Sequence, residues 1–177
     1  MIPTLETERL VLRGLQMDDL DEYAAVYADS EVMRHLENGV PLDRAAAWRS
    51  MAVHLGHWQL RGYGQWALVE RSSQALVGRA GLWQPEGWPG LEIGWLLARP
   101  QWGRGFATEA GRGALSYAFD VVGAERVISL IRPNNTPSIR VAERLGERHE
   151  RTIELHGGAA HVYAIERHES EAPAPSR

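Results

Sequence analysis

The sequence contains no cysteine and no lysine. Without cysteine, the chain cannot form a disulfide, use a thiolate nucleophile or bind a metal through a cysteine. Because lysine is absent, all 19 basic residues are arginine, and the Gly-Lys pair of a Walker phosphate-binding loop cannot occur. His149, His156, His161 and His168 lack the close cysteine or carboxylate spacing that is typical of a metal site. We therefore expect no metal.

An excess of positive charge is also missing, since the formal net charge is −4. Nucleic acids are bound by basic surfaces, so we expect no nucleic-acid partner. No apolar run approaches the roughly 20 residues that a membrane helix needs, and Met1–Glu6 lacks the basic and apolar regions of a signal peptide. These absences predict a cytoplasmic protein with no membrane partner.

The length of 177 residues fits one domain with a substantial core. Residues 169–177 are polar and rich in proline, which predicts a disordered tail. The predicted domain therefore covers residues 5–168.

Short alternating or apolar runs predict about seven strands, and longer runs with helical spacing predict about four helices. The predicted strands are 9–15, 65–71, 75–82, 91–97, 126–131, 152–156 and 160–166. The predicted helices are 18–27, 43–60, 105–121 and 137–145. The second helix is expected to bury Trp48, Met51, Leu55 and Trp58, and the third Ala107, Gly111, Ala114, Leu115 and Ala118. Adjacent strands followed by alternating helices and strands predict an α/β (α+β) fold with a mixed sheet covered on both faces.

The most informative segment is Glu92–Ala110, with the sequence EIGWLLARPQWGRGFATEA. A strand ends, the chain turns through Gly103 and Gly105, and a helix begins. Such a turn aims backbone N–H groups and the positive end of a helix at one point, which suits a phosphate. A dinucleotide-binding fingerprint would need a third glycine where Thr108 stands. A glycine-rich turn without any ligand is the remaining alternative.

This segment resembles a known family. WGRGFATEA (102–110) is similar to the acyl-CoA pyrophosphate loop of the GNAT acetyltransferase superfamily. ETERLVLR (6–13) resembles the first strand of the branch that contains the ribosomal-protein alanine N-acetyltransferases, and PNNTPS (133–138) and ERLG (143–146) follow in the same order. The resemblance implies the GNAT fold, which has a central, mixed, mostly antiparallel and splayed sheet with helices on both faces.

The resemblance also implies that acetyl-CoA is the co-substrate. The loop would give backbone N–H groups to the pyrophosphate, the end of the preceding strand would pair with the pantetheine amides, and the pantetheine arm would lie where this strand splays from the next. Asn135 would hydrogen-bond that arm and Ser138 would lie near the thioester sulfur. The implied cofactor-binding residues are Leu96, Leu97, Ala98, Trp102, Gly103, Arg104, Gly105, Phe106, Ala107, Thr108, Asn135 and Ser138.

Acetyl transfer to an amine requires removal of a proton from the ammonium group and stabilisation of the developing oxyanion. With no cysteine in the chain, direct attack of the amine on the thioester is the simplest scheme. Glu92, at the start of the strand that leads into the loop, is the predicted base, and nearby tryptophans would raise its pKa. The alternative is a strand-end carboxylate exposed to solvent. His54 and His57 are other candidate bases, or solvated residues on a helix surface.

The sequence departs from the family pattern at two places. The tyrosine that serves as the acid in many GNAT enzymes has no counterpart in RVAER (140–144). Ser138 or water would then protonate the leaving thiolate. The aromatic residue that usually follows Gly146 is replaced by Glu147.

The predicted function is therefore an acetyl-CoA-dependent N-acetyltransferase whose acceptor is a primary amine, either a protein N-terminus or a small molecule. Two alternatives stay open. The first is a non-catalytic domain that binds or senses acyl-CoA, and the second is a transferase of a larger acyl group such as succinyl. A homodimer is implied by resemblance only.

Overall fold

The computed structural model describes residues 1–36 and 39–170. Its last element, α6 (Arg167–Ser170), covers the first two residues of the predicted tail. The rest of that tail, 171–177, lies outside the described residues. None of the helices in the described ranges combines the length and apolarity required to cross a membrane.

Within the described residues, eight strands form a single sheet. They are β1 (Leu5–Glu6), β2 (Leu10–Arg13), β3 (Gln65–Glu70), β4 (Leu76–Trp83), β5 (Glu92–Leu97), β6 (Arg126–Ile131), β7 (Arg148–Leu155) and β8 (Gly158–Glu166). Their order in the sheet is β1-β2-β3-β4-β5-β6-β8-β7. Neighbours are antiparallel except for β5 and β6. The mixed, mostly antiparallel sheet was predicted correctly, whereas β1 was missed because two residues show no alternation.

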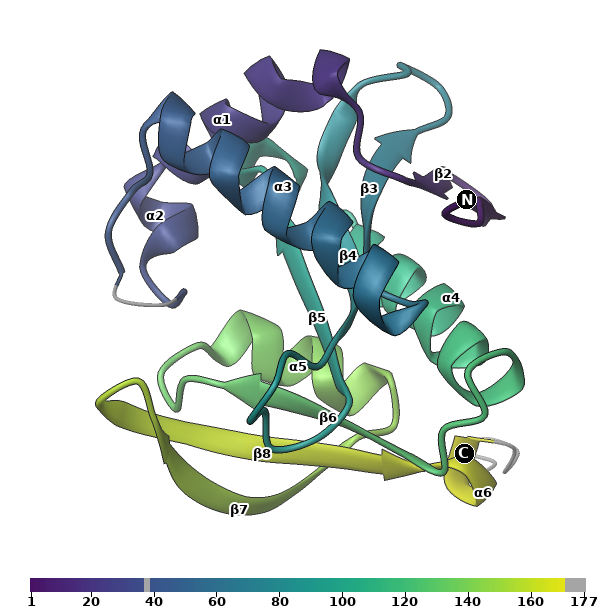
Figure 1. Ribbon diagram of the computed structural model, residues 1–177. Helices are drawn as coiled ribbons and strands as arrows, with labels where there is room; N and C mark the ends of the chain where they lie inside the picture. The colour runs from purple at the N-terminus through teal and green to yellow at the C-terminus, as the bar shows by residue number, and fades with distance from the viewer. Residues whose placement is uncertain (37–38, 171–177) are drawn as a thin grey trace.

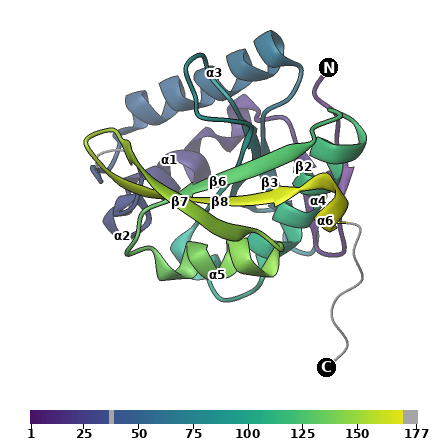
Figure 2. The same ribbon diagram turned by 90° about the horizontal axis from the view of Figure 1, so that it is seen from below.

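Helices cover both faces of this sheet, as the two ribbon views show (Figures 1 and 2). One face carries α1 (Leu20–Ala28), α2 (Ser30–Met33) and α3 (Arg44–Arg61), which form a core cluster with residues of β3, β4 and β5. On the other face, α4 (Phe106–Asp120) packs on β2, β4 and β5, and α5 (Thr136–Arg144) packs on α4 and β6. The short α2 was not predicted, since a single turn carries no periodic signal.

The buried face of α3 differs from the predicted one. Its buried residues are Ala47, Met51, His54, His57 and Trp58. Trp48 and Leu55 are instead 49% and 37% exposed. The prediction that His54 and His57 are solvated is wrong, because both rings contact Trp83, with centroid distances of 5.1 Å and 4.5 Å. Two sets of apolar and aromatic residues on α3 recur with the helical period, and they lie on overlapping faces of the helix. Contacts with β4 decide which face is buried.

The predicted buried face of α4 is confirmed. Ala107, Gly111, Ala114, Leu115 and Ala118 are all buried. A Cβ on Gly111 would stand 2.7 Å from the Leu145 side chain. The glycine therefore lets the end of α5 approach α4 closely.

The sheet splays between β5 and β6. β4 and β5 are paired at six positions, but β5 and β6 are paired only at Glu92↔Ile128. One residue further along, the Ser129 hydroxyl donates to the Ile93 carbonyl oxygen at 2.9 Å. Beyond this bridge β5 has no recorded pairing with β6 in the described part of the chain. The main-chain groups at the end of β5 therefore face a gap, which matches the predicted splay.

Candidate active site

The loop before α4 presents backbone N–H groups to solvent. Gly103 and Gly105 have φ angles of +75° and +84°, which favour glycine. Gly105 is the N-cap of α4, and no side chain caps the helix there. A Cβ on Gly103 would meet no atom within 4 Å. The first turn of α4 thus has uncapped donors and open space in front of its positive end, as an anion site requires.

Two arginines add positive charge beside this loop. The guanidinium carbons of Arg9 and Arg104 lie 4.8 Å and 4.5 Å from the centroid of the Phe106 ring. Arg9 is fixed by Glu109, whose carboxylate accepts from Arg9 Nε at 2.7 Å and from Thr7 Oγ1 at 2.6 Å. The opening strand motif and the loop motif therefore meet in space, and Glu109 joins them.

The end of β5 is tied to the loop. The indole N–H of Trp102 donates to the Leu97 carbonyl oxygen at 2.9 Å, and the N–H of Ala98 donates to Val77 of β4, also at 2.9 Å. Across the gap, Asn135 is the N-cap of α5, and its side chain accepts from the N–H of Ser138 at 3.3 Å. Trp102 and Asn135 thus hold main-chain segments on the two sides of the splay.

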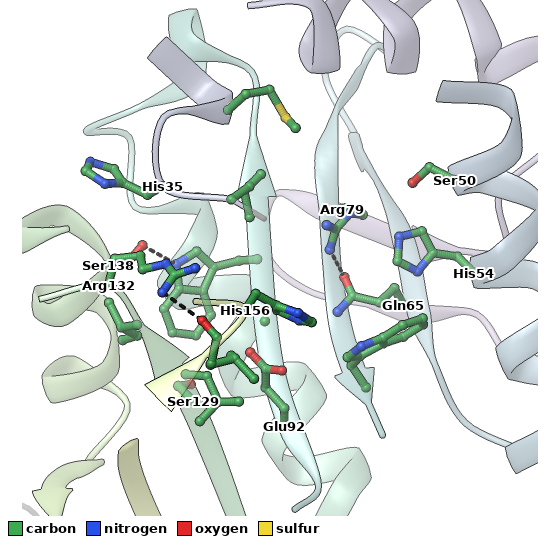
Figure 3. A pocket seen from close by; sticks show the side chains of 18 of the residues that line it. His35, Ser50, His54, Gln65, Arg79, Glu92, Ser129, Arg132, Ser138 and His156 are labelled. Carbon is green, nitrogen blue, oxygen red and sulfur yellow. Dashed lines mark hydrogen bonds between the residues drawn. The ribbon is translucent and has the colours of Figure 1, made fainter. Parts of the chain in front are cut away.

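A cavity of about 780 Å³ opens beside the splay, between α3, β3, β4, β5, β6 and the turn between β7 and β8 (Figure 3). Of the predicted site residues, it brings together Glu92, Asn135 and Ser138. Trp102 to Thr108 are not among its lining residues and form a separate part of the site. Trp88 and His156 lie side by side at its edge, with ring centroids 5.8 Å apart.

Glu92 is partly buried within this cavity. Burial raises the pKa of its carboxyl to about 7, although Trp88, the backbone of Leu130 and the charge of Arg79 act in the opposite direction. The Trp88 indole donates to Glu92 Oε2 at 2.7 Å. A carboxylate with this pKa is half ionised near neutral pH and can accept a proton from an ammonium group.

Ser138 is poised as a proton donor. Its Oγ accepts a 3.3 Å hydrogen bond from Trp95 Nε1. Because an indole N–H is only a donor, the serine keeps its own hydroxyl proton for a partner in the cavity.

The two histidines of α3 differ in their chemistry. His57 is held at both nitrogens, by the Tyr63 carbonyl oxygen at 2.9 Å and the Gln84 N–H at 3.0 Å, which fixes the neutral Nδ1–H form. This makes it a structural link between α3 and the strands. His54 lines the cavity, and burial lowers its pKa well below the usual value.

Glu147, which replaces the family's aromatic residue, is buried behind the cavity wall. Its Oε1 lies 3.0 Å from Ser129 Oγ, which also contacts the Ile93 carbonyl oxygen. Ser129 has one hydroxyl proton for these two acceptors, and a protonated Glu147 that donates to Ser129 would leave this proton for the Ile93 carbonyl oxygen. We therefore expect Glu147 to be a neutral acid. Burial raises its pKa to about 8, and the charge of Glu92 acts in the same direction.

A Glu147→Gln variant should make stability less dependent on pH. A carboxyl with a raised pKa binds its proton more tightly in the folded state, so the wild type should lose stability as the pH rises from about 5 to about 8. Each pKa unit corresponds to about 1.36 kcal/mol. The free energy of unfolding, measured with urea at several pH values in this range, should fall less steeply with pH for the variant. The decrease that remains would come from Glu92. Glu8→Gln, at an exposed position, is the control. If Glu147→Gln leaves the pH dependence of the unfolding free energy unchanged, Glu147 is not a neutral acid in the folded protein.

The sequence prediction missed four side chains of the site: Gln65, Arg79, Trp88 and Ser129. Arg79 carried a signal, because an arginine stands within the apolar run of β4. Gln65 at the start of β3 and Ser129 in the middle of β6 are polar residues at buried strand positions. Tryptophans were expected near Glu92, but the hydrogen bond from Trp88 to its carboxylate was not predicted.

Known proteins share this sequence pattern and fold. The family described as "Acetyltransferase (GNAT) domain" matches residues 9–148. The curated protein "Uncharacterized N-acetyltransferase p20" of Bacillus licheniformis is 31% identical over 144 residues, which cover 80% of each chain. The chain therefore belongs to the GNAT acetyltransferase family and is an acyltransferase.

Solved structures agree. An acetyltransferase from Agrobacterium tumefaciens superposes with a TM-score of 0.83 at 30% identity, covering 94% of this chain and 96% of its own. A GNAT-family acetyltransferase from Bacillus anthracis gives 0.82 at 27% identity, covering 96% and 100%. RimL, a ribosomal L7/L12 alpha-N-protein acetyltransferase in complex with coenzyme A, gives 0.79 over 96% and 100%. At 15% identity, RimL shares the fold alone.

Proposed function

We propose that the chain transfers the acetyl group of acetyl-CoA to a primary amine by direct attack. The observation that carries the proposal is the position of Glu92, a carboxylate with a pKa near neutrality in a cavity beside the splay of the sheet. The family uses acetyl-CoA, and the coenzyme A bound to RimL is consistent with the same donor here.

The chain's residues fit the donor. The uncapped N-terminus of α4, with Gly103 to Thr108, would hold the pyrophosphate, and Arg9 and Arg104 add charge beside it. Leu96, Leu97 and Ala98 lie at or just after the end of β5, beside the gap that the pantetheine arm would occupy. When bound, the thioester supplies the activated acetyl group.

Each proton and bond has a place in this scheme. The ammonium gives a proton to Glu92, directly or through water, and the freed amine nitrogen forms a bond to the thioester carbon. The carbon–sulfur bond breaks, and the thiolate takes a proton from Ser138 or from water. The second proton, which the attacking nitrogen loses as the amide forms, replaces the one that Ser138 or water gave up. The nucleophile is the acceptor's own amine, since the chain has no cysteine.

The test is a release assay with several acyl donors and amines. A thiol-reactive dye reports only released coenzyme A, because the protein has no thiol of its own. Acetyl-CoA should give amine-dependent release, and succinyl-CoA much less. Faster release with succinyl-CoA would favour a transferase of larger acyl groups. Tight acetyl-CoA binding without release for any amine would favour the binding domain, which the missing tyrosine supports.

A further inference from the structure

Arg79 is a cation inside the cavity that Glu92 also lines, and it forms no direct ion pair with a described residue. It lies on β4, and its side chain points into the cavity next to Gln65 (Figure 3). Its Nε donates to Tyr27 Oη at 2.6 Å, and its Nη1 donates to Gln65 Oε1 at 2.5 Å. Both acceptors are neutral. No carboxylate of residues 1–36 or 39–170 forms an ion pair with Arg79, whereas the partly buried Arg13 has Asp19 at 2.6 Å.

The guanidinium is held in place by its neighbours. Tyr27 stacks on Tyr23 with ring centroids 4.6 Å apart, and the Tyr23 hydroxyl lies 3.0 Å from both Tyr27 Oη and Ser50 Oγ. Gln65 is buried, with only 3% of its surface exposed. These contacts use two of the five guanidinium N–H donors, and Nη2 donates to no residue in the described ranges. A fixed cation with unused donors suits a carboxylate, which accepts two parallel hydrogen bonds.

The floor of the cavity is open between Arg79 and Glu92. Arg79, Gly81 and Trp83 alternate onto the same face of β4, and their partners on β5 are Leu96, Gly94 and Glu92. A Cβ on Gly94 would stand 3.4 Å from Gln65 Nε2 and 3.9 Å from Glu92 Oε1. Gly94 lines the cavity without a side chain of its own, so one small molecule lying over it can reach both Glu92 and the Arg79–Gln65 pair.

The charge of the cavity favours an anion as well. Its described lining contains three arginines, Arg49, Arg79 and Arg132, and one carboxylate, Glu92. The whole chain has a net charge of −4, so this positive lining is local. A polyamine, which brings only positive charge, would be repelled by it. An acceptor that also carries a carboxylate would instead add an ion pair to the two hydrogen bonds that the guanidinium makes with neutral groups.

We propose that Arg79 and Gln65 form a subsite for a carboxylate of the acceptor, so that the substrate is a small amine with a carboxylate, such as an amino acid. The inference rests on the proposed function, because it places the amine of the same molecule at Glu92. It favours a small-molecule acceptor over a protein N-terminus, whose α-amine has no carboxylate beside it.

The experiment measures kcat/KM with amino acids, with the same amino acids as carboxamides, and with peptides that have a free N-terminus. The wild type should prefer the carboxylate form by about 10- to 100-fold, the range for a charge-assisted pair. Arg79→Met should remove this preference while acetyl-CoA binding persists. Arg112→Met, an exposed arginine on α4, should retain it.

A second variant tests the subsite independently, in case Arg79→Met does not fold. Gln65→Glu is nearly isosteric and places a carboxylate 2.5 Å from Arg79 Nη1, so it should also abolish the preference. Equal use of carboxamides, a preference for peptides, or a preference that survives both variants would overturn the subsite. In those cases acetylation still occurs and the proposed function stands. If no amine supports release of coenzyme A, the proposed function itself fails.

Discussion

Replacing Glu92 with glutamine should lower kcat/KM at neutral pH by about 10²- to 10⁴-fold, the usual contribution of a positioned general base. Glutamine keeps the size of the side chain and can still accept from the Trp88 indole, but it cannot take a proton. Binding of acetyl-CoA, measured by calorimetry, should be unchanged because Glu92 lies on the acceptor side of the site. The loss should therefore fall on turnover alone.

The pH profile gives a sharper readout of the same residue. Wild-type activity should rise with pH through an apparent pKa of about 7 and then level off, since only the ionised carboxylate accepts a proton. The Glu92→Gln profile should lack this limb and rise only as the free amine titrates. Trp88→Phe removes a hydrogen bond that lowers the pKa of Glu92, so it should move the limb to higher pH. Glu8→Gln is the matched control, and a normal profile for Glu92→Gln would remove Glu92 from the mechanism.

The second large effect is expected at the loop. Gly103→Val should weaken acetyl-CoA binding by about 100-fold or more, because the new side chain would occupy the open space before α4 and displace at least two hydrogen bonds to the pyrophosphate. Titration calorimetry with acetyl-CoA measures the loss directly.

This substitution has a control with matched backbone strain. Gly123, after the end of α4, has a φ angle of +76°, and a Cβ there also meets no atom within 4 Å. Gly123→Val should lower stability to a similar degree, by about 1–3 kcal/mol, and bind acetyl-CoA normally. If the two variants bind equally well, the pyrophosphate is not bound at this loop.

The sequence predicts most of the fold because its longer elements have clear periods. The α4 face was predicted residue by residue, and β6 was predicted with its observed bounds, Arg126–Ile131. The face of α3 was not, since burial of His54 and His57 depends on Trp83, a residue distant in sequence. Tertiary contacts decide between two faces that hydropathy leaves nearly equal.

The candidate site also has one part that the sequence predicts and another that it does not. The loop was found because its glycines and helix start are contiguous in sequence. Arg79, Gln65 and Glu92 come from three strands, and only their register places them around the Gly94 floor. The neutral state of Glu147 depends on a single shared proton at Ser129, which no sequence pattern records. Contacts of this kind appear only when the strands are assembled.

The most direct test of the account is mass spectrometry after incubation with isotope-labelled acetyl-CoA and an amine that also carries a carboxylate. Direct attack predicts the label on the amine nitrogen and an unchanged mass for the protein, with or without the amine. A stable labelled protein would contradict direct attack. Binding of acetyl-CoA without a labelled product, for any amine tried, would contradict the assignment of this chain as an N-acetyltransferase.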